Sequence, residues 1–159
     1  MSNHDYITKD GMLKIQRRIQ YLQETERPEV IHRVSVAREL GDLSENAEYK
    51  AAKEKQREID QELDHLKVRS AKLRVIDPIT LPKDKVTFGA IVKVKELDSG
   101  RDVTYRIVGV DEVNFTEEGL DLVSIASPIG KALLSRKPGE EVTIQAPMGK
   151  RIFKIYSIE

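Results

Sequence analysis

Residues 37–53 read ARELGDLSENAEYKAAK, and two long helical patterns meet within this stretch. Upstream, the pattern runs to Leu40 and meets Gly41, a residue type that favours the left-handed conformation just past a helix end. Downstream, Ser44 can cap a second helix that starts at Glu45. Two long helices joined by so short a connection predict an antiparallel hairpin with the acidic segment 41–45 at its tip.

The segment before the tip has the apolar spacing of a helix. Thr8 is a candidate N-cap for its start. Pro28 should kink the helix or restart it, because the proline ring clashes with the preceding turn. The apolar residues recur at three- and four-residue spacing, which places them on one stripe. This stripe consists of Met12, Ile15, Ile19, Leu22, Val30 and Val34.

The segment after the tip contains no proline or glycine from Glu45 to about Ile76. About 30 residues at ~1.5 Å each would make an arm roughly 45 Å long. Small residues near the tip, Ala47 and Ala51, would allow the two helices to approach closely. The larger apolar residues keep a spacing close to a heptad, which is typical of a coiled coil. They are Ile59, Leu63, Leu66 and Leu73.

The pattern changes after Ile76. Residues 77–84 have the composition of a linker, with prolines at both ends. Beyond them the apolar period becomes two, which is typical of strands. We therefore predict an α+β protein with three parts: a coiled-coil hairpin over 1–76, the linker over 77–84 and a small antiparallel sheet domain over 85–159.

The sheet domain should consist of two hairpins, a further strand and one short helix. The turn at 98–100 (DSG) separates strands around 91–94 and 103–107, and another strand covers 122–125. Ser127 and Pro128 suit the N-cap and first position of a helix that runs through Leu134. Strands over 142–146 and 152–158 form the last hairpin.

Composition limits the chemistry that is available. The 159 residues include no cysteine, so disulfides and thiolate metal sites are excluded. The formal net charge is zero, so any nucleic-acid contact must come from a local patch. The sequence contains no zinc-protease, phosphate-loop or serine-hydrolase pattern, and the acid pairs 111–112 and 117–118 fit solvated loops. No stretch approaches ~20 apolar residues, and we expect a soluble, cytoplasmic protein.

The strongest chemical candidate is the pair Asp42 and Glu45, three residues apart across the tight turn. Two carboxylates at this separation can share a hard divalent cation such as Mg²⁺. Alone they would hold it weakly, so further ligands would come from a partner site and its phosphates. On spacing alone, a turn aspartate and a first-turn glutamate remain the commoner explanation.

Basic residues lie close to the tip on both helices. Lys50, Lys53 and Arg57 share one face of the second helix, and Arg38 lies one turn before the tip on the first. Such a stripe could hold a single nucleic-acid strand by its phosphates. The alternative is a solvated face with local ion pairs to interleaved glutamates.

The segment 37–53 closely resembles the signature of the bacterial Gre transcript-cleavage factors. Residues 26–30 (ERPEV) are similar to the kinked first helix of the family. Residues 88–90, 105–109 and 127–129 are similar to its C-terminal domain. The resemblance covers essentially the whole chain and favours a GreA-like over a GreB-like member.

This resemblance implies a coiled-coil domain and an FKBP-like C-terminal domain that docks on RNA polymerase through Ser127 and Pro128. The arm would enter the secondary channel, where Asp42 and Glu45 would help to hold the second Mg²⁺. Arg38 and Lys53, extended by Lys50 and Arg57, would grip the 3′ segment of backtracked RNA. Ala126 stands where some members carry an acidic or amide residue.

The implied protein is not itself an enzyme, since the polymerase supplies the active site. We expect a monomer with no cofactor in the free state and no membrane partner. The alternative within the same architecture is a non-cleaving regulator that occludes the channel and slows nucleotide addition. An autonomous hydrolase is a third option, which the lack of a catalytic motif disfavours.

Overall fold

A computed structural model describes residues 5–41, 46–115, 119–147 and 149–159. The chain forms two compact units, which we call the arm (Leu13–Lys72) and the sheet unit (Met1–Met12 with Leu73–Glu159). This grouping differs from the expected linear division at 76 and 84. The reason is that strand β1 (Tyr6–Thr8) pairs in parallel with β2 (Arg74–Ile76). The first residues of the chain therefore pack with its second half.

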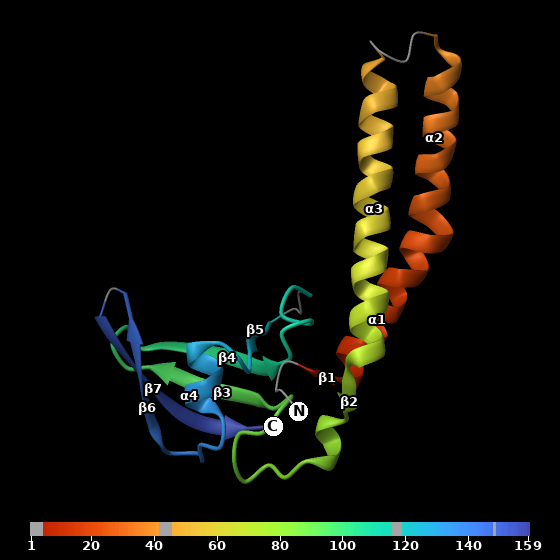
Figure 1. Cartoon of the computed structure of the whole chain (residues 1–159). Helices are drawn as coiled ribbons and strands as arrows, with labels where there is room; N and C mark the ends of the chain where they lie inside the picture. The colour runs from red at the N-terminus through yellow and green to blue at the C-terminus, as the bar shows by residue number, and fades with distance from the viewer. Residues whose placement is uncertain (1–4, 42–45, 116–118, 148) are drawn as a thin grey trace. The chain divides into compact units, whose positions relative to one another are not determined.

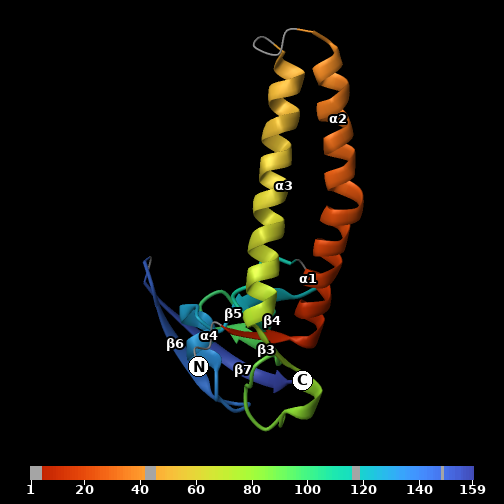
Figure 2. The ribbon, with the colours of Figure 1, turned by 45° about the vertical axis from the view of Figure 1, so that its right-hand side comes forward.

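The arm is a helical hairpin, as predicted. Helix α1 (Lys9–Tyr21) begins in the sheet unit and is followed without a break by the π-helix η2 (Leu22–Glu26) and by α2 (Arg27–Glu39). Helix α3 (Ala47–Lys72) returns along α2, and Figures 1 and 2 show the two helices side by side. None of the described helices is long and apolar enough to cross a membrane.

Most of the predicted apolar stripe lies in the core of the arm, whereas Met12 is half-buried and belongs to the sheet unit. Leu22 and Val30 are fully buried and face Ile59 and Leu63 of α3 in one cluster. Val34 extends this cluster toward the tip, where the buried residues become small. The small residues that are buried there are Ala37 and Ala52, whereas Ala47 and Ala51 are exposed. The sequence therefore predicted the wrong alanines: the small residues buried between the helices are Ala37 and Ala52, not Ala47 and Ala51.

The helix continues through the segment around Pro28 and does not restart there, because Glu26 and Arg27 both keep right-handed helical backbone angles. Pro28 lies in the first turn of α2. The π-helix η2 directly precedes it and provides a wider turn before the proline ring.

The sheet unit contains a five-stranded sheet in the order β5–β4–β3–β7–β6. The strands are β3 (Ile91–Glu96), β4 (Arg101–Val108), β5 (Asp121–Ser124), β6 (Glu141–Ala146) and β7 (Gly149–Ile158). Neighbouring pairs are antiparallel except β4 and β5, which run parallel. The α+β class is confirmed, but the sheet is mixed rather than wholly antiparallel.

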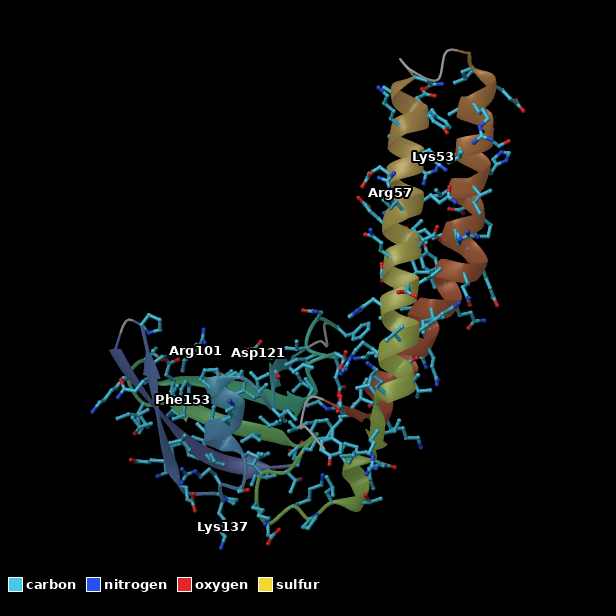
Figure 3. All side chains as sticks on the ribbon, viewed as in Figure 1. Lys53, Arg57, Arg101, Asp121, Lys137 and Phe153 are labelled. Carbon is cyan, nitrogen blue, oxygen red and sulfur yellow. The ribbon has the colours of Figure 1, made fainter. Side chains whose placement is uncertain are left out.

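Alternating residues of β3, β4 and β7 build the core of the sheet unit. Phe153, labelled in Figure 3, is 1% exposed and packs edge-on against Tyr105 at 6.4 Å between ring centroids. Leu133 of helix α4 (Pro128–Leu133) belongs to the same cluster. The period-two pattern read from the sequence thus identifies the buried face of the sheet.

A buried carboxylate joins the start of α1 to the sheet. Glu112 is 4% exposed and accepts hydrogen bonds from the N–H of Thr8 (2.7 Å), the hydroxyl of Thr8 (2.6 Å) and the N–H of Gly109 (3.2 Å). Thr8 also caps α1 as predicted, because its Oγ1 accepts from the N–H of Gly11 at 3.0 Å. The interpretation of Glu112 as solvated loop charge was therefore wrong.

Candidate functional site

The tip of the arm begins where α2 ends. The N–H of Leu40 donates to the carbonyl of Ala37 at 3.1 Å and closes the last turn. Gly41 follows with φ +121°, and a Cβ built there would meet nothing within 4 Å. The backbone conformation rather than crowding therefore favours glycine at this position, as the sequence predicted.

The other side of the tip is organised by Asn46. Its Oδ1 accepts from the N–H of Tyr49 at 3.0 Å, which is the geometry of an N-cap. Its Nδ2 donates across the hairpin to the carbonyl of Ala37 at 2.7 Å. Helix α3 thus begins at Ala47 and is capped by Asn46, two residues later than the predicted cap at Ser44.

The carboxylates of Asp42 and Glu45 lie outside the described residues. Chain connectivity places both in the connection between Gly41 and Asn46, whose two flanks meet at Ala37 through the Asn46 side chain. Among the described residues, no group of three or more histidines or acidic side chains could hold a metal ion.

Arg38 and Tyr49 form a contact between the two helices close to the tip. The guanidinium carbon of Arg38 lies 5.8 Å from the centroid of the Tyr49 ring, within the range of a cation–π interaction. Tyr49 is half-buried and packs against the core of the arm. The contact orders the Arg38 side chain while its charge stays exposed to solvent.

The structure brings two of the other predicted cations together. Lys53 and Arg57, both on α3 in Figure 3, line one shallow groove of about 400 Å³. Arg57 is also paired with Glu54, one turn earlier. Lys50 is exposed nearer the start of the helix and does not line this groove. The face of α3 that carries the predicted cations is therefore basic near the tip. Farther from the tip, the same groove is lined by the acidic residues Asp60 and Asp64.

A second groove, of about 520 Å³, runs between α2 and α3 behind the tip. Most of its side chains are small or apolar, since alanines replace the larger residues found lower in the arm. They are His32, Arg33, Val36, Ala37, Glu48, Ala51 and Ala52. Of the described cations predicted to bind nucleic acid, Arg38, Lys50, Lys53 and Arg57, none lines this groove.

Ion pairs become frequent farther from the tip. Arg18 donates two hydrogen bonds to Glu62, at 2.7 and 2.9 Å. This contact lowers the pKa of the Glu62 carboxyl and raises the pKa of Arg18. Arg27 and Asp60 form another pair at 2.7 Å. These contacts join the two sides of the arm.

Ser127 and Pro128 lie in the sheet unit at the start of α4. Ser127 caps this helix: its hydroxyl accepts from the N–H of Gly130 at 3.1 Å and donates to the carbonyl of Ser124 at 2.6 Å. Pro128 occupies the first turn and is exposed. Of the two residues, Pro128 thus presents the freer surface, while Ser127 is engaged in shaping the turn.

Asn46 and Tyr49 are the tip residues that sequence reasoning missed. An asparagine three residues before Tyr49 is a capping signal, but Ser44 gives an equally good local signal. The contacts that single out Asn46 and Tyr49 cross to α2, at Ala37 and Arg38.

A helical hairpin arm and a mixed-sheet unit place the chain among two-part α+β proteins that carry their candidate site at the end of the arm. The family model described as "Transcription elongation factor, N-terminal" matches residues 5–75. The model described as "Transcription elongation factor, GreA/GreB, C-term" matches residues 81–159. The chain belongs to the GreA/GreB family of transcription elongation factors.

Curated relatives agree with this assignment. The chain is 41% identical to the transcription elongation factor GreA of Maridesulfovibrio salexigens over 96% of this chain and 92% of that protein. It is 40% identical to GreA of Helicobacter hepaticus, over 96% of this chain and 91% of that protein. The GreA-like resemblance is in line with these names.

Among solved structures, the chain is similar to the crystal structure of GreA factor homolog 1 (Gfh1) of Thermus thermophilus. The identity is 23%, the TM-score is 0.43, and 97% of each chain is covered.

Proposed function

We propose that this chain binds RNA polymerase and stimulates the cleavage of backtracked RNA by the polymerase. In this proposal the arm enters the secondary channel and brings Asp42 and Glu45 to the catalytic centre. The observation that carries the proposal is the location of this acidic pair. It lies in a seven-residue connection, 40–46, at the end of a hairpin arm whose flanks are joined by Asn46.

The donor set at the tip fits a shared Mg²⁺ ion rather than a resident one. Carboxylate oxygens are the ligands that Mg²⁺ prefers, but two of them leave most of an octahedral shell unfilled. When bound, the ion would supply an activated water and neutralise charge on the phosphate. Asp42 and Glu45 would hold and orient it together with ligands from the polymerase.

The cations around the tip would bind the RNA. Arg38, Lys50, Lys53 and Arg57 are all able to contact phosphates, which position a strand without reading its sequence. The contact of Arg38 with Tyr49 supports this role, because an ordered guanidinium loses less side-chain entropy on binding than a free one.

Docking would involve the sheet unit at the start of α4. Pro128 is exposed there and would contact the polymerase directly. Ser127 would contribute mainly by holding the turn, given its two internal hydrogen bonds.

The test uses stalled elongation complexes that contain backtracked RNA. Adding the protein should release short 3′ fragments, and the double variant D42A/E45A should lose this activity by about two orders of magnitude or more, in line with the removal of metal-orienting groups. The variant should still compete with the wild type for polymerase. Cleavage at the wild-type rate by D42A/E45A would refute the proposed role of these residues.

Two further outcomes separate the alternatives. If the protein slows nucleotide addition without releasing fragments, it is a regulator that occludes the channel. If the protein cleaves RNA in the presence of Mg²⁺ but without polymerase, it is a hydrolase in its own right. The proposal predicts neither result.

A further inference from the structure

The two sides of the tip are joined by one side chain. Asn46 caps α3 through its Oδ1, 3.0 Å from the N–H of Tyr49, and reaches the carbonyl of Ala37 on α2 through its Nδ2 at 2.7 Å. The two bonds use opposite ends of the same amide. The start of α3 is therefore held at a fixed separation from the last turn of α2.

The apolar packing beside this link is thin. Among the described residues, the buried apolar side chains nearest this link are Ala37 and Ala52, at 3% and 6% exposure, and each has a single methyl group; Val34, about one turn below Ala37, is the next buried residue. The larger pair Ile59 and Leu63 lies two to three turns farther down α3. Because stabilisation scales with buried apolar area, alanines hold the two helices together less firmly than the residues below.

We propose that Asn46 is a positioning residue for the tip carboxylates, because its link fixes the separation of the two ends of the connection that carries Asp42 and Glu45. This inference rests on the proposed function. Mg²⁺ demands near-ideal ligand geometry, and an error of about 1 Å in the placement of reacting groups can cost about 100-fold in rate. A cap alone would stabilise α3 without fixing this separation.

Two substitutions separate the link from the cap. Asn46→Ser and Asn46→Asp keep an oxygen that can accept from the N–H of Tyr49, and both residue types are good N-caps. The ionised aspartate has no donor, and the serine hydroxyl is one bond shorter than the asparagine amide, so it cannot make the 2.7 Å bond that Nδ2 makes to the carbonyl of Ala37. Asn46→Ser is neutral and Asn46→Asp adds a negative charge. An effect that both variants share is therefore due to the loss of the hydrogen bond to Ala37 and not to charge. Asn114→Ser, at an exposed site in the sheet unit, is the matched control.

The first measurement does not depend on function. The chain has no cysteine, so spin labels can be attached at E39C and A47C without further changes. Pulsed electron resonance should give a narrow distance distribution for the wild-type background and a broader one for Asn46→Ser. An unchanged distribution would overturn the inference, whether or not the protein stimulates cleavage.

The second measurement is RNA cleavage in stalled complexes over a range of Mg²⁺ concentrations. We expect Asn46→Ser and Asn46→Asp to cleave about tenfold more slowly at limiting Mg²⁺, with recovery as Mg²⁺ rises, because misplaced ligands weaken binding of the ion. Asn114→Ser should match the wild type. Wild-type rates at limiting Mg²⁺ would overturn the inference, as would a loss that Mg²⁺ cannot restore. If the wild type itself fails to stimulate cleavage, the proposed function fails, and the distance measurement still decides whether Asn46 fixes the connection.

Discussion

In the sheet unit, the carboxylate of Glu112 is buried and accepts three hydrogen bonds, whereas in the arm the carboxylate of Glu62 forms an ion pair that is 39% exposed on both sides. A buried acceptor cannot be removed without leaving its donors unsatisfied, which costs about 1–3 kcal/mol for each group. An exposed pair is worth about 0.2–1 kcal/mol. Removing Glu112 should therefore destabilise the sheet unit more than removing Glu62 destabilises the arm.

The largest effect should come from Glu112→Ala. The N–H groups of Thr8 and Gly109 would lose a buried acceptor, and we expect the free energy of unfolding to fall by about 3 kcal/mol. Urea denaturation followed by circular dichroism measures this. Glu141→Ala, at an exposed site on β6, should change stability by less than about 0.5 kcal/mol. Equal effects of the two substitutions would show that the buried hydrogen bonds of Glu112 add nothing to stability.

A smaller effect is expected from Gly11→Ala. Alanine is the better helix former by about 1 kcal/mol, yet its Cβ would clash with Oε2 of Glu112 and lie 2.9 Å from Cγ1 of Ile7. Overpacking costs about 1–3 kcal/mol, so we expect a net loss of about 1 kcal/mol.

The double variant Gly11→Ala with Glu112→Ala sharpens this prediction. Its loss should be smaller than the sum of the two single losses, because removing the carboxylate relieves most of the clash. Strict additivity would show that Glu112 and Gly11 act independently.

The smallest effect should be seen with Glu62→Gln in the arm. The hydrogen bonds from Arg18 lower the pKa of Glu62 in the folded state. The resulting stabilisation, about 0.5 kcal/mol after solvent screening, is present above the unfolded-state pKa of about 4.3 and is lost as the pH falls through the lower folded-state value. The stability difference between wild type and variant should therefore shrink as the pH is lowered from 6 to about 3. A difference that grows on acidification would contradict this assignment.

Features that repeat along the chain could be predicted from the sequence. The stripe from Ile15 to Val34 and the alternation in β3 and β4 recur several times, so single errors do not change the prediction. The cap at Thr8 was also predictable, because it depends on residues within one turn.

Features that depend on single distant contacts were not predictable. Glu112 is buried because Thr8, 104 residues away, donates to it. The strands β1 and β2 have three residues each, too few to show a period. Asn46 and Ser44 are equivalent as local caps, and the bond across the hairpin to Ala37 distinguishes them.

The π-helix η2 determines how far α2 is rotated about its own axis, and so which residues of α2 face α3. Leu22, Glu26, Val30 and Val34 follow one another at intervals of four, and in a regular α-helix each interval overshoots a full turn by about 40°. The wider turn of η2 takes up part of this drift, and Leu22 and Val30 remain together in the seam with α3. Deleting one residue from 22–26 would turn α2 by about 100° about its axis. The same five residues therefore decide which side of α2 carries Arg38 when the chain reaches the tip.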